Sequence, residues 1–427
     1  MDFGTRQATR LEAIGGRVDP WLLGAVLALG CLGFVMVGSS SMAKADADGL
    51  GAFYFLVRHA MFLGAGLLAA LWVMRLELKT VEQRSQWLLP VCLLMLLLVF
   101  VPGFGHEVNG ARRWINLGVS NFQVVEAVKV FYIVWLASYL KRYSEEVSAT
   151  WPAMLKPLGV AVLLVCLLLL QPDFGSSTLL LGITAGMLVL GGVNMPRMFG
   201  PVLVGLPVLV AVAIAEPYRV KRLTSFIDPF ADPFGSGYQL ANALMAVGRG
   251  EWFGVGLGAS VQKLNYLPEA HTDFILAVIA EELGFAGVLL VVALFTLLVG
   301  RALWVGYDCV RMRRYFAGYC AFGIALWMGL QSFVSIGVNL GLLPTKGLTL
   351  PLVSYGGSSV VMTCAALGLL LRVSYELERA KRQVALRRGE VATAPSEPLL
   401  HAGATVTPLR GTSRLRERVE PTLGVTP

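Results

Sequence analysis

The chain consists of long apolar runs separated by short polar segments. A helix that crosses a bilayer needs about 20 mostly apolar residues, and most of the runs reach that length. The run Leu158–Leu170 is shorter. We expect either that the bilayer is thinned around it or that the helix extends through Lys156, whose ammonium can reach the membrane surface. No stretch shows the two-residue period of a strand. The pattern predicts an all-α membrane protein, a bundle of ten transmembrane helices at Pro20–Gly38, Phe53–Met74, Trp87–Val101, Asn121–Leu140, Leu158–Leu170, Gly175–Val193, Met198–Ala215, Asp273–Gly300, Tyr315–Leu340 and Leu352–Leu371.

The composition argues against a soluble globular protein. The 427 residues are 56% hydrophobic and 15% charged, whereas soluble domains carry about 25% charged residues. The six cysteines lie inside predicted spans, except Cys309 in a predicted cytoplasmic loop. None lies in an outer loop, where oxidation is possible, so we expect neither a disulfide framework nor a cysteine metal cluster.

The basic residues predict the orientation. Of 35 Lys and Arg residues, 24 fall in the two tails and the alternate loops that share their side. Because cytoplasmic segments carry the excess of basic residues, we expect both termini to be cytoplasmic. The net charge of +8 then reflects topology and a basic tail, and no nucleic-acid partner is expected.

We expect three parts: a cytoplasmic tail over 1–19, the membrane domain over 20–374, and a basic, mostly disordered cytoplasmic tail over 375–427. The last is either simply solvated or a docking segment for a partner. The outer loop 216–272, between the seventh and eighth spans, is too long for a connector. It contains an apolar helical stretch, Tyr238–Val247, and a glycine-rich run over 248–258. No strand precedes that run, so it predicts turns and close backbone approach, not a nucleotide site.

Polar and ionisable residues inside the predicted spans are candidates for function, because burying charge in lipid is costly. Gln123, Glu126 and Lys129 share one span, and the two charged residues are three positions apart on one helical face. They form either a structural ion pair between helices or a substrate contact. Glu281 and Glu282 lie about 12 Å deeper along the eighth span, close to mid-bilayer, and need partners there.

Other charged residues lie at the outer ends of the spans. Asp173 lies in a tight turn, where an aspartate either satisfies turn amides or faces an outer cavity. Asp273 follows His271 at the start of the eighth span, and by pattern alone it is a helix-start residue. The outer loops add three cations beside span ends, Arg112, Arg113 and Lys346. Together these residues suit a phosphate-bearing amphiphile from the outer leaflet.

Several longer motifs resemble the SEDS family, the FtsW and RodA group. They are Asn109–Ile115 (NGARRWI), Gln171–Gly175 (QPDFG), Leu267–Phe274 (LPEAHTDF), Glu281–Gly284 (EELG), Leu343–Gly347 (LPTKG) and Pro351–Ser359 (PLVSYGGSS). The resemblance covers roughly residues 20 to 372, and its motif forms are similar to the division-specific branch of the family. One motif departs from the usual pattern, because a proline and a small residue are replaced by Val124 and Val125, although Gln123, Glu126 and Lys129 remain.

The resemblance implies a peptidoglycan glycosyltransferase of the bacterial inner membrane at the division septum. Such proteins polymerise lipid II, a disaccharide-pentapeptide on undecaprenyl pyrophosphate, beside a class B penicillin-binding transpeptidase and other division-complex proteins. The family's essential outer aspartate matches Asp273, which the resemblance therefore makes catalytic. It makes Arg112, Arg113, Gln123, Glu126, Lys129, Asp173, His271 and Lys346 candidates for substrate binding.

The reaction needs a general base for the attacking sugar hydroxyl and positive charge for the leaving pyrophosphate. We expect Asp273 to be the base, cations or a divalent metal (Mg or Mn) to stabilise the leaving group, and no nucleotide or haem. A lipid II flippase would share the buried charges, but it needs polar residues across the whole membrane depth. A non-catalytic scaffold for the transpeptidase is the third alternative.

Overall fold

The computed structural model describes residues 15–387, except 109, 117 and 119, and its regular elements are mostly helices. The first half comprises α2 (Pro20–Ala47), α3 (Tyr54–Arg75), α4 (Leu78–Arg84), η1 (Ser85–Trp87), α5 (Leu88–Leu98), β1 (Gly105–Val108), β2 (Ala111–Asn116), β3 (Asn121–Gln123), α6 (Val124–Arg142), α7 (Ser144–Ala149) and α8 (Trp151–Leu170). The second half comprises α9 (Phe174–Leu190), α10 (Met195–Ile214), α11 (Pro217–Ile227), α12 (Tyr238–Gly250), α13 (Ile275–Arg311), α14 (Tyr315–Asn339) and α15 (Gly357–Arg387).

Each of the ten predicted spans falls on a helix, which confirms the all-helical membrane fold. Within the described residues, seven helices are long and apolar enough to cross a membrane: α2, α3, α8, α10, α13, α14 and α15. The helices α5 and α9 have 11 and 17 residues, and α6 carries charges. The count of ten crossings therefore stays a prediction. Helix α8 begins at Trp151 and includes Lys156, so the short apolar run extends as one of the two alternatives predicted.

The prediction that no strand is present was wrong for residues 105–123. There β1, β2 and β3 form an antiparallel sheet in that order, and Val108 pairs with Ala111 across a two-residue turn. Gly110 in this turn has φ 75°, a conformation that glycine adopts without strain. The strands are three to six residues long, too short for a period of two to stand out.

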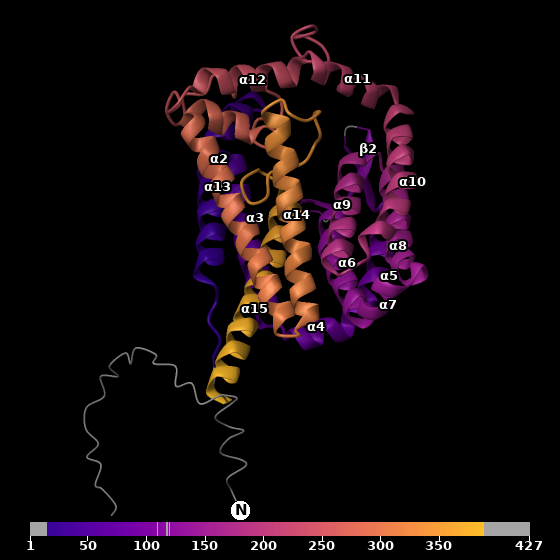
Figure 1. Ribbon diagram of the computed structural model, residues 1–427. Coiled ribbons are helices and arrows are strands. Elements are labelled where there is room, and N and C mark those ends of the chain that lie inside the picture. The colour runs from indigo at the N-terminus through magenta and orange to yellow at the C-terminus, as the bar shows by residue number, and fades with distance from the viewer. Residues whose placement is uncertain (1–14, 109, 117, 119, 388–427) are drawn as a thin grey trace, which may run out of the picture. The chain divides into compact units, whose positions relative to one another are not determined.

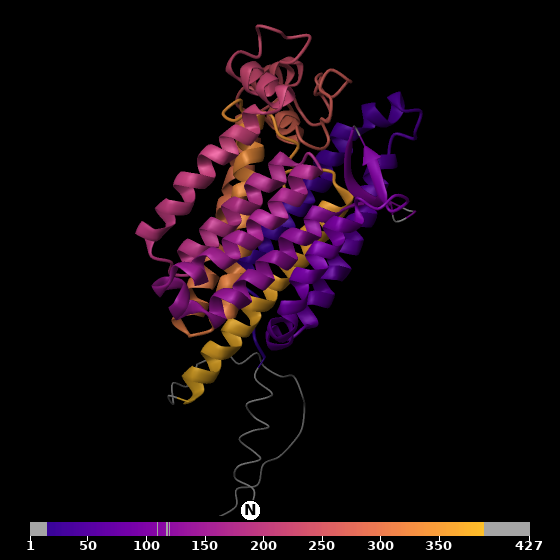
Figure 2. The same cartoon turned by 90° about the vertical axis from the view of Figure 1, so that its right-hand side faces the viewer.

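Burial distinguishes the interior helices from those at the edge. Helix α6 is buried on all sides at most of its positions and packs against α14, as expected for a central helix. Only 6% of the 18-residue apolar stretch of α10 is buried inside the protein, so most of this stretch is available to lipid. Figures 1 and 2 show α11, α12 and the sheet at the same end of the bundle.

Helix α13 is broken at Gly284, whose φ of 68° and ψ of −165° are not helical. The backbone groups that this break frees pair with the glycine-rich run of the outer loop. The amides of Val255 and Gly256 donate to the carbonyls of Glu281 and Glu282 at 2.9 and 3.1 Å. Tight packing explains two of the glycines, since a Cβ on Gly250 would lie 1.8 Å from the Ala280 carbonyl oxygen and a Cβ on Gly254 would lie 2.2 Å from the Glu282 carbonyl oxygen. The predicted close backbone approach is therefore present. The depth of the two glutamates in the membrane stays a prediction.

Both glutamates are fully buried, and both hold the outer loop. Glu281 accepts hydrogen bonds from Arg249, from the Ser260 hydroxyl and from the amides of Val261 and Gln262. Glu282 accepts from Lys263 Nζ at 2.7 Å and from the Ser39 hydroxyl of α2 at 2.7 Å. These carboxylates hold residues 249–263 against α13. The prediction that the two buried glutamates need partners is therefore confirmed.

We expect Glu281→Ala to release this part of the loop. The substitution leaves the Ser260 hydroxyl and two backbone amides without an acceptor, and each unsatisfied buried group costs about 1–3 kcal/mol. Hydrogen exchange of the Val261 and Gln262 amides should become about 10-fold faster or more, because local opening exposes them. Mass spectrometry of the purified protein measures this exchange. Unchanged exchange at both amides would contradict the assignment, and the α6 amides serve as the internal control.

Candidate functional site

Asp273 lies in the turn that leads into α13, two residues before the helix begins. The buried Asn339 at the end of α14 fixes this turn. Its Nδ2 donates to the Asp273 carbonyl oxygen at 2.9 Å, and its Oδ1 accepts from the Ala277 amide at 3.0 Å. The Asp273 side chain is half-buried and does not cap the helix. Asp273 therefore stands at the start of the helix, as the pattern predicted, but its carboxylate is not used as a cap and is left for another role.

The segment 343–349 passes directly beside the Asp273 carboxylate. A Cβ on Gly347 would lie 3.3 Å from Asp273 Oδ2, so only a residue without a side chain fits comfortably there. Burial raises the pKa of Asp273 to about 7, and the neighbouring Glu269 carboxylate raises the pKa further while the Arg222 guanidinium lowers it. A carboxyl with a pKa near 7 can exchange protons at neutral pH.

Lys346 precedes Gly347 on the segment that passes Asp273, and its side chain contacts α9. Its Nζ lies 3.5 Å from the Thr178 hydroxyl and 5.2 Å from the ring centroid of Phe174, both on α9. Burial lowers the pKa of Lys346. The role of Lys346 in substrate binding stays a prediction.

Two arginines that sequence reasoning missed lie beside Lys346. Arg219 of α11 places its guanidinium carbon 5.2 Å from the centroid of the same Phe174 ring. Arg222 donates from Nη1 to the Thr345 carbonyl oxygen at 3.2 Å. Their spacing of three residues, which places both on one face of a helix, was the available signal. It was overlooked because the helix was expected only over 238–247.

The other predicted outer residues have structural partners. Arg112 is exposed and pairs with Glu107 at 3.0 Å. Arg113 donates to the carbonyls of Gln171 and Pro172, at 3.0 and 2.6 Å. Asp173 is buried and caps α9 by accepting from the Ser176 amide at 3.0 Å, which agrees with its turn-satisfying interpretation. None of these contacts brings the three side chains to Asp273.

Glu126 and Lys129 form a buried ion pair at 2.9 Å. Lys129 is fully buried, also donates to Gln331 Oε1 at 2.9 Å, and lies 4.7 Å from the centroid of the Trp327 ring. The ion pair lies within α6, and the contacts of Lys129 with Gln331 and Trp327 join α6 to α14. Gln123 precedes α6, and its backbone N–H donates to the Ser358 hydroxyl at 3.2 Å.

His271 belongs to an aromatic cluster with Phe55 and Tyr355. The ring centroids of Phe55 and Tyr355 lie 5.0 and 5.5 Å from that of His271, and the Tyr355 amide donates to the His271 carbonyl oxygen at 2.9 Å. Burial lowers the pKa of His271, so the neutral imidazole is favoured. This cluster fixes the residues immediately before Asp273.

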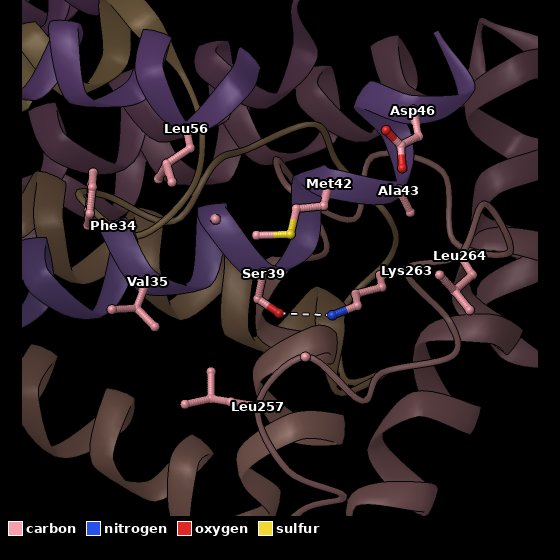
Figure 3. A pocket seen from close by; sticks show the side chains of 12 residues that line it. Phe34, Val35, Ser39, Met42, Ala43, Asp46, Leu56, Leu257, Lys263 and Leu264 are labelled. Carbon is pink, nitrogen blue, oxygen red and sulfur yellow. Dashed lines mark hydrogen bonds between the residues drawn. The ribbon is translucent and has the colours of Figure 1, made fainter. Parts of the chain in front are cut away.

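A groove of about 540 Å³ lies elsewhere, between α2 and residues 257–264. Figure 3 shows Ser39 and Lys263 pointing toward each other in it, with the apolar side chains Phe34, Val35, Met42, Leu56, Leu257 and Leu264 around them. Lys263 is already paired with Glu282, and neither Asp273 nor Lys346 lines the groove.

Among the residues that the structure describes, no three His, Cys, Asp or Glu side chains cluster as ligands for a metal. The predicted Mg or Mn stays a prediction.

Comparison with known proteins identifies the family. Residues 20–379 match the model of the FtsW/RodA/SpoVE cell cycle proteins. The chain is 61% identical to a probable peptidoglycan glycosyltransferase FtsW of Xanthomonas oryzae, over 99% of this chain and 93% of the relative. A second probable FtsW, of Aromatoleum aromaticum, is 50% identical over 86% and 90%.

Solved structures agree. A chain from a peptidoglycan synthase complex that coordinates polymerization and crosslinking superposes with a TM-score of 0.70 at 32% identity, over 84% of this chain and 98% of that one. The rod shape determining protein RodA of Thermus thermophilus superposes with a TM-score of 0.62 at 30% identity, over 84% and 96%. The predicted resemblance is confirmed, and the chain belongs to the FtsW/RodA/SpoVE group of SEDS proteins.

Proposed function

We propose that this chain is a peptidoglycan glycosyltransferase that polymerises lipid II at the outer face of the cytoplasmic membrane during septal wall synthesis. The observation that carries the proposal is the half-buried Asp273 carboxyl, with a pKa raised to about 7, held beside Gly347 in a protein of this family. In the orientation predicted from the basic residues, both termini are cytoplasmic, and α11, α12 and the Asp273 turn face the outer side of the membrane.

In the proposed reaction the 4-hydroxyl of an acceptor sugar attacks the anomeric carbon of the lipid-linked donor, with inversion. Asp273 takes the hydroxyl proton as the new carbon–oxygen bond forms. The bond from the anomeric carbon to the diphosphate breaks, and its electron pair stays on the diphosphate oxygen. The nearby Lys346 ammonium offsets part of this charge. A divalent cation bound to the diphosphate would supply further charge neutralisation.

The partner is proposed to be a class B penicillin-binding transpeptidase of the division complex, because the similar solved chain comes from a synthase complex that couples polymerization to crosslinking. Purified protein supplied with lipid II, with and without that transpeptidase, tests the function. Glycan strands resolved by length are expected, and longer strands or faster synthesis are expected with the partner. Lipid II that crosses vesicle membranes without forming strands would favour the transporter alternative instead.

The activity should depend on pH through Asp273. A base must be ionised, and the pKa of this carboxyl is raised to about 7, so kcat/KM should rise as the pH increases and level off above about 7. Below that value the slope should approach tenfold per pH unit. The initial rate of lipid II polymerisation between pH 5.5 and 8.5 measures it. A flat profile from pH 5.5 upward would contradict the raised pKa.

A further inference from the structure

Helix α11 presents one face to the bundle and the other to solvent. Arg219 and Arg222 are half-buried, whereas Lys221 between them is exposed. The spacing of three residues places the two arginines on the same side of the helix. In Figure 1 this helix lies across the end of the bundle that also carries α12. The inner face of α11 is therefore cationic.

The two arginines and Lys346 converge on one small region. Arg219 Cζ and Lys346 Nζ both lie 5.2 Å from the centroid of the Phe174 ring. Arg222 is bound to the carbonyl oxygen of Thr345, the residue before Lys346, and its charge reaches Asp273 strongly enough to lower the pKa of that carboxyl. Three cations from two separate segments are thus gathered around Phe174 and Thr345, and one of them, Arg222, also acts on Asp273.

Arg219 and Lys346 have no carboxylate partner within the described part of the chain. Arg219 donates to the Val212 carbonyl at 2.7 Å, and Lys346 has Thr178 as its hydrogen-bond acceptor. By contrast Arg112 and Lys129, both predicted phosphate ligands, are each paired with a glutamate of this chain. A region with this excess of positive charge favours a multivalent anion.

On the basis of the proposed function, we propose that Arg219 and Arg222, together with Lys346, bind the diphosphate of the lipid-linked substrate. A guanidinium offers two parallel N–H donors to phosphate oxygens, and a lysine adds a point charge. When the sugar–diphosphate bond breaks, the negative charge gained by the diphosphate oxygen is stabilised by these cations, while Asp273 receives the acceptor's proton. Helix α11 is then part of the substrate site.

The test separates binding from catalysis. Full-length protein carrying Asp273→Asn is titrated with farnesyl diphosphate and, separately, with farnesyl monophosphate. Arg219→Gln and Arg222→Gln are added one at a time, and Lys221→Gln is the matched control on the exposed face. Each arginine substitution should weaken diphosphate binding about tenfold or more, the loss expected for one charge-assisted contact. Monophosphate binding should weaken less, and Lys221→Gln should leave both affinities within about twofold.

If both arginine variants bind the diphosphate as tightly as the Lys221→Gln control, the proposal is overturned. This holds even if the unsubstituted protein polymerises lipid II. If Gln variants lose their thermal transition, Arg219→Lys and Arg222→Lys replace them. These variants keep the charge but lose the paired donors, so a several-fold weaker affinity is expected, and an unchanged one counts against the site. Failure of the proposed function has a different signature: no glycan strands from the unsubstituted protein, whatever the binding results.

Discussion

Asp273→Asn should reduce glycan polymerisation by about a thousand-fold, because loss of a general base typically costs 10²–10⁴ in rate. Asparagine has nearly the same shape but cannot accept the proton of the attacking sugar hydroxyl. The expected readout is strand formation from lipid II by the purified protein with its transpeptidase. Product strands at the unsubstituted rate would remove Asp273 as the base.

The variant should fold normally. Burial raises the pKa of Asp273 above its unfolded value, so this carboxyl favours the folded state at low pH and loses that contribution as the pH rises through about 7. Asparagine imitates the neutral form, and at pH 8 the thermal midpoint should be equal or slightly higher. Glu269→Gln is the matched control, since Glu269 is an exposed carboxylate in the same turn. It should change the rate by only a small factor.

The same variant separates the alternatives. A transporter would continue to move lipid II across the membrane, since transport needs no base at the outer sugar. A scaffold would continue to assemble with the transpeptidase and to support its crosslinking. Loss of polymerisation with assembly intact is the result expected of an enzyme.

The helices were predictable because lipid imposes a simple rule on sequence. A spanning segment must be apolar over its whole length and must satisfy its own backbone groups, so each span leaves a visible run. The break at Gly284 left no such trace. It depends on the loop amides of Val255 and Gly256, which satisfy the backbone from a distant part of the chain. Local hydropathy does not reveal hydrogen bonds between residues that are far apart in the sequence.

The site was predictable only in part, for a similar reason. Motifs pointed to Asp273 and Lys346, and the structure places the segment that carries Lys346 against Asp273 at Gly347. The roles of Arg113 and Asp173 depend on which groups they meet after folding. One binds backbone carbonyls and the other caps α9. Arg219 was missed because its significance comes from Phe174 and Lys346, which are close only in three dimensions.

Lys129→Met should have the largest effect on stability. The substitution leaves the buried Glu126 without its cation, and breaking one side of a buried ion pair costs about 3–5 kcal/mol. Gln331 also loses a donor, and Trp327 loses the ammonium near its ring. The purified variant should melt at a lower temperature and accumulate poorly in membranes. Lys44→Met is the matched control, because the Lys44–Asp48 pair at 2.9 Å is exposed and worth about 1 kcal/mol or less.

The double variant Glu126→Gln with Lys129→Met decides between the two predicted roles of this pair. It removes both charges together, so most of the lost stability should return, because no uncompensated charge stays buried. If lipid II polymerisation returns as well, the pair is structural, as its contacts between α6 and α14 indicate. If stability returns while polymerisation stays at background, the pair contacts substrate. If the single Lys129→Met variant has the same melting temperature as the unsubstituted protein, that result would contradict the buried ion pair itself.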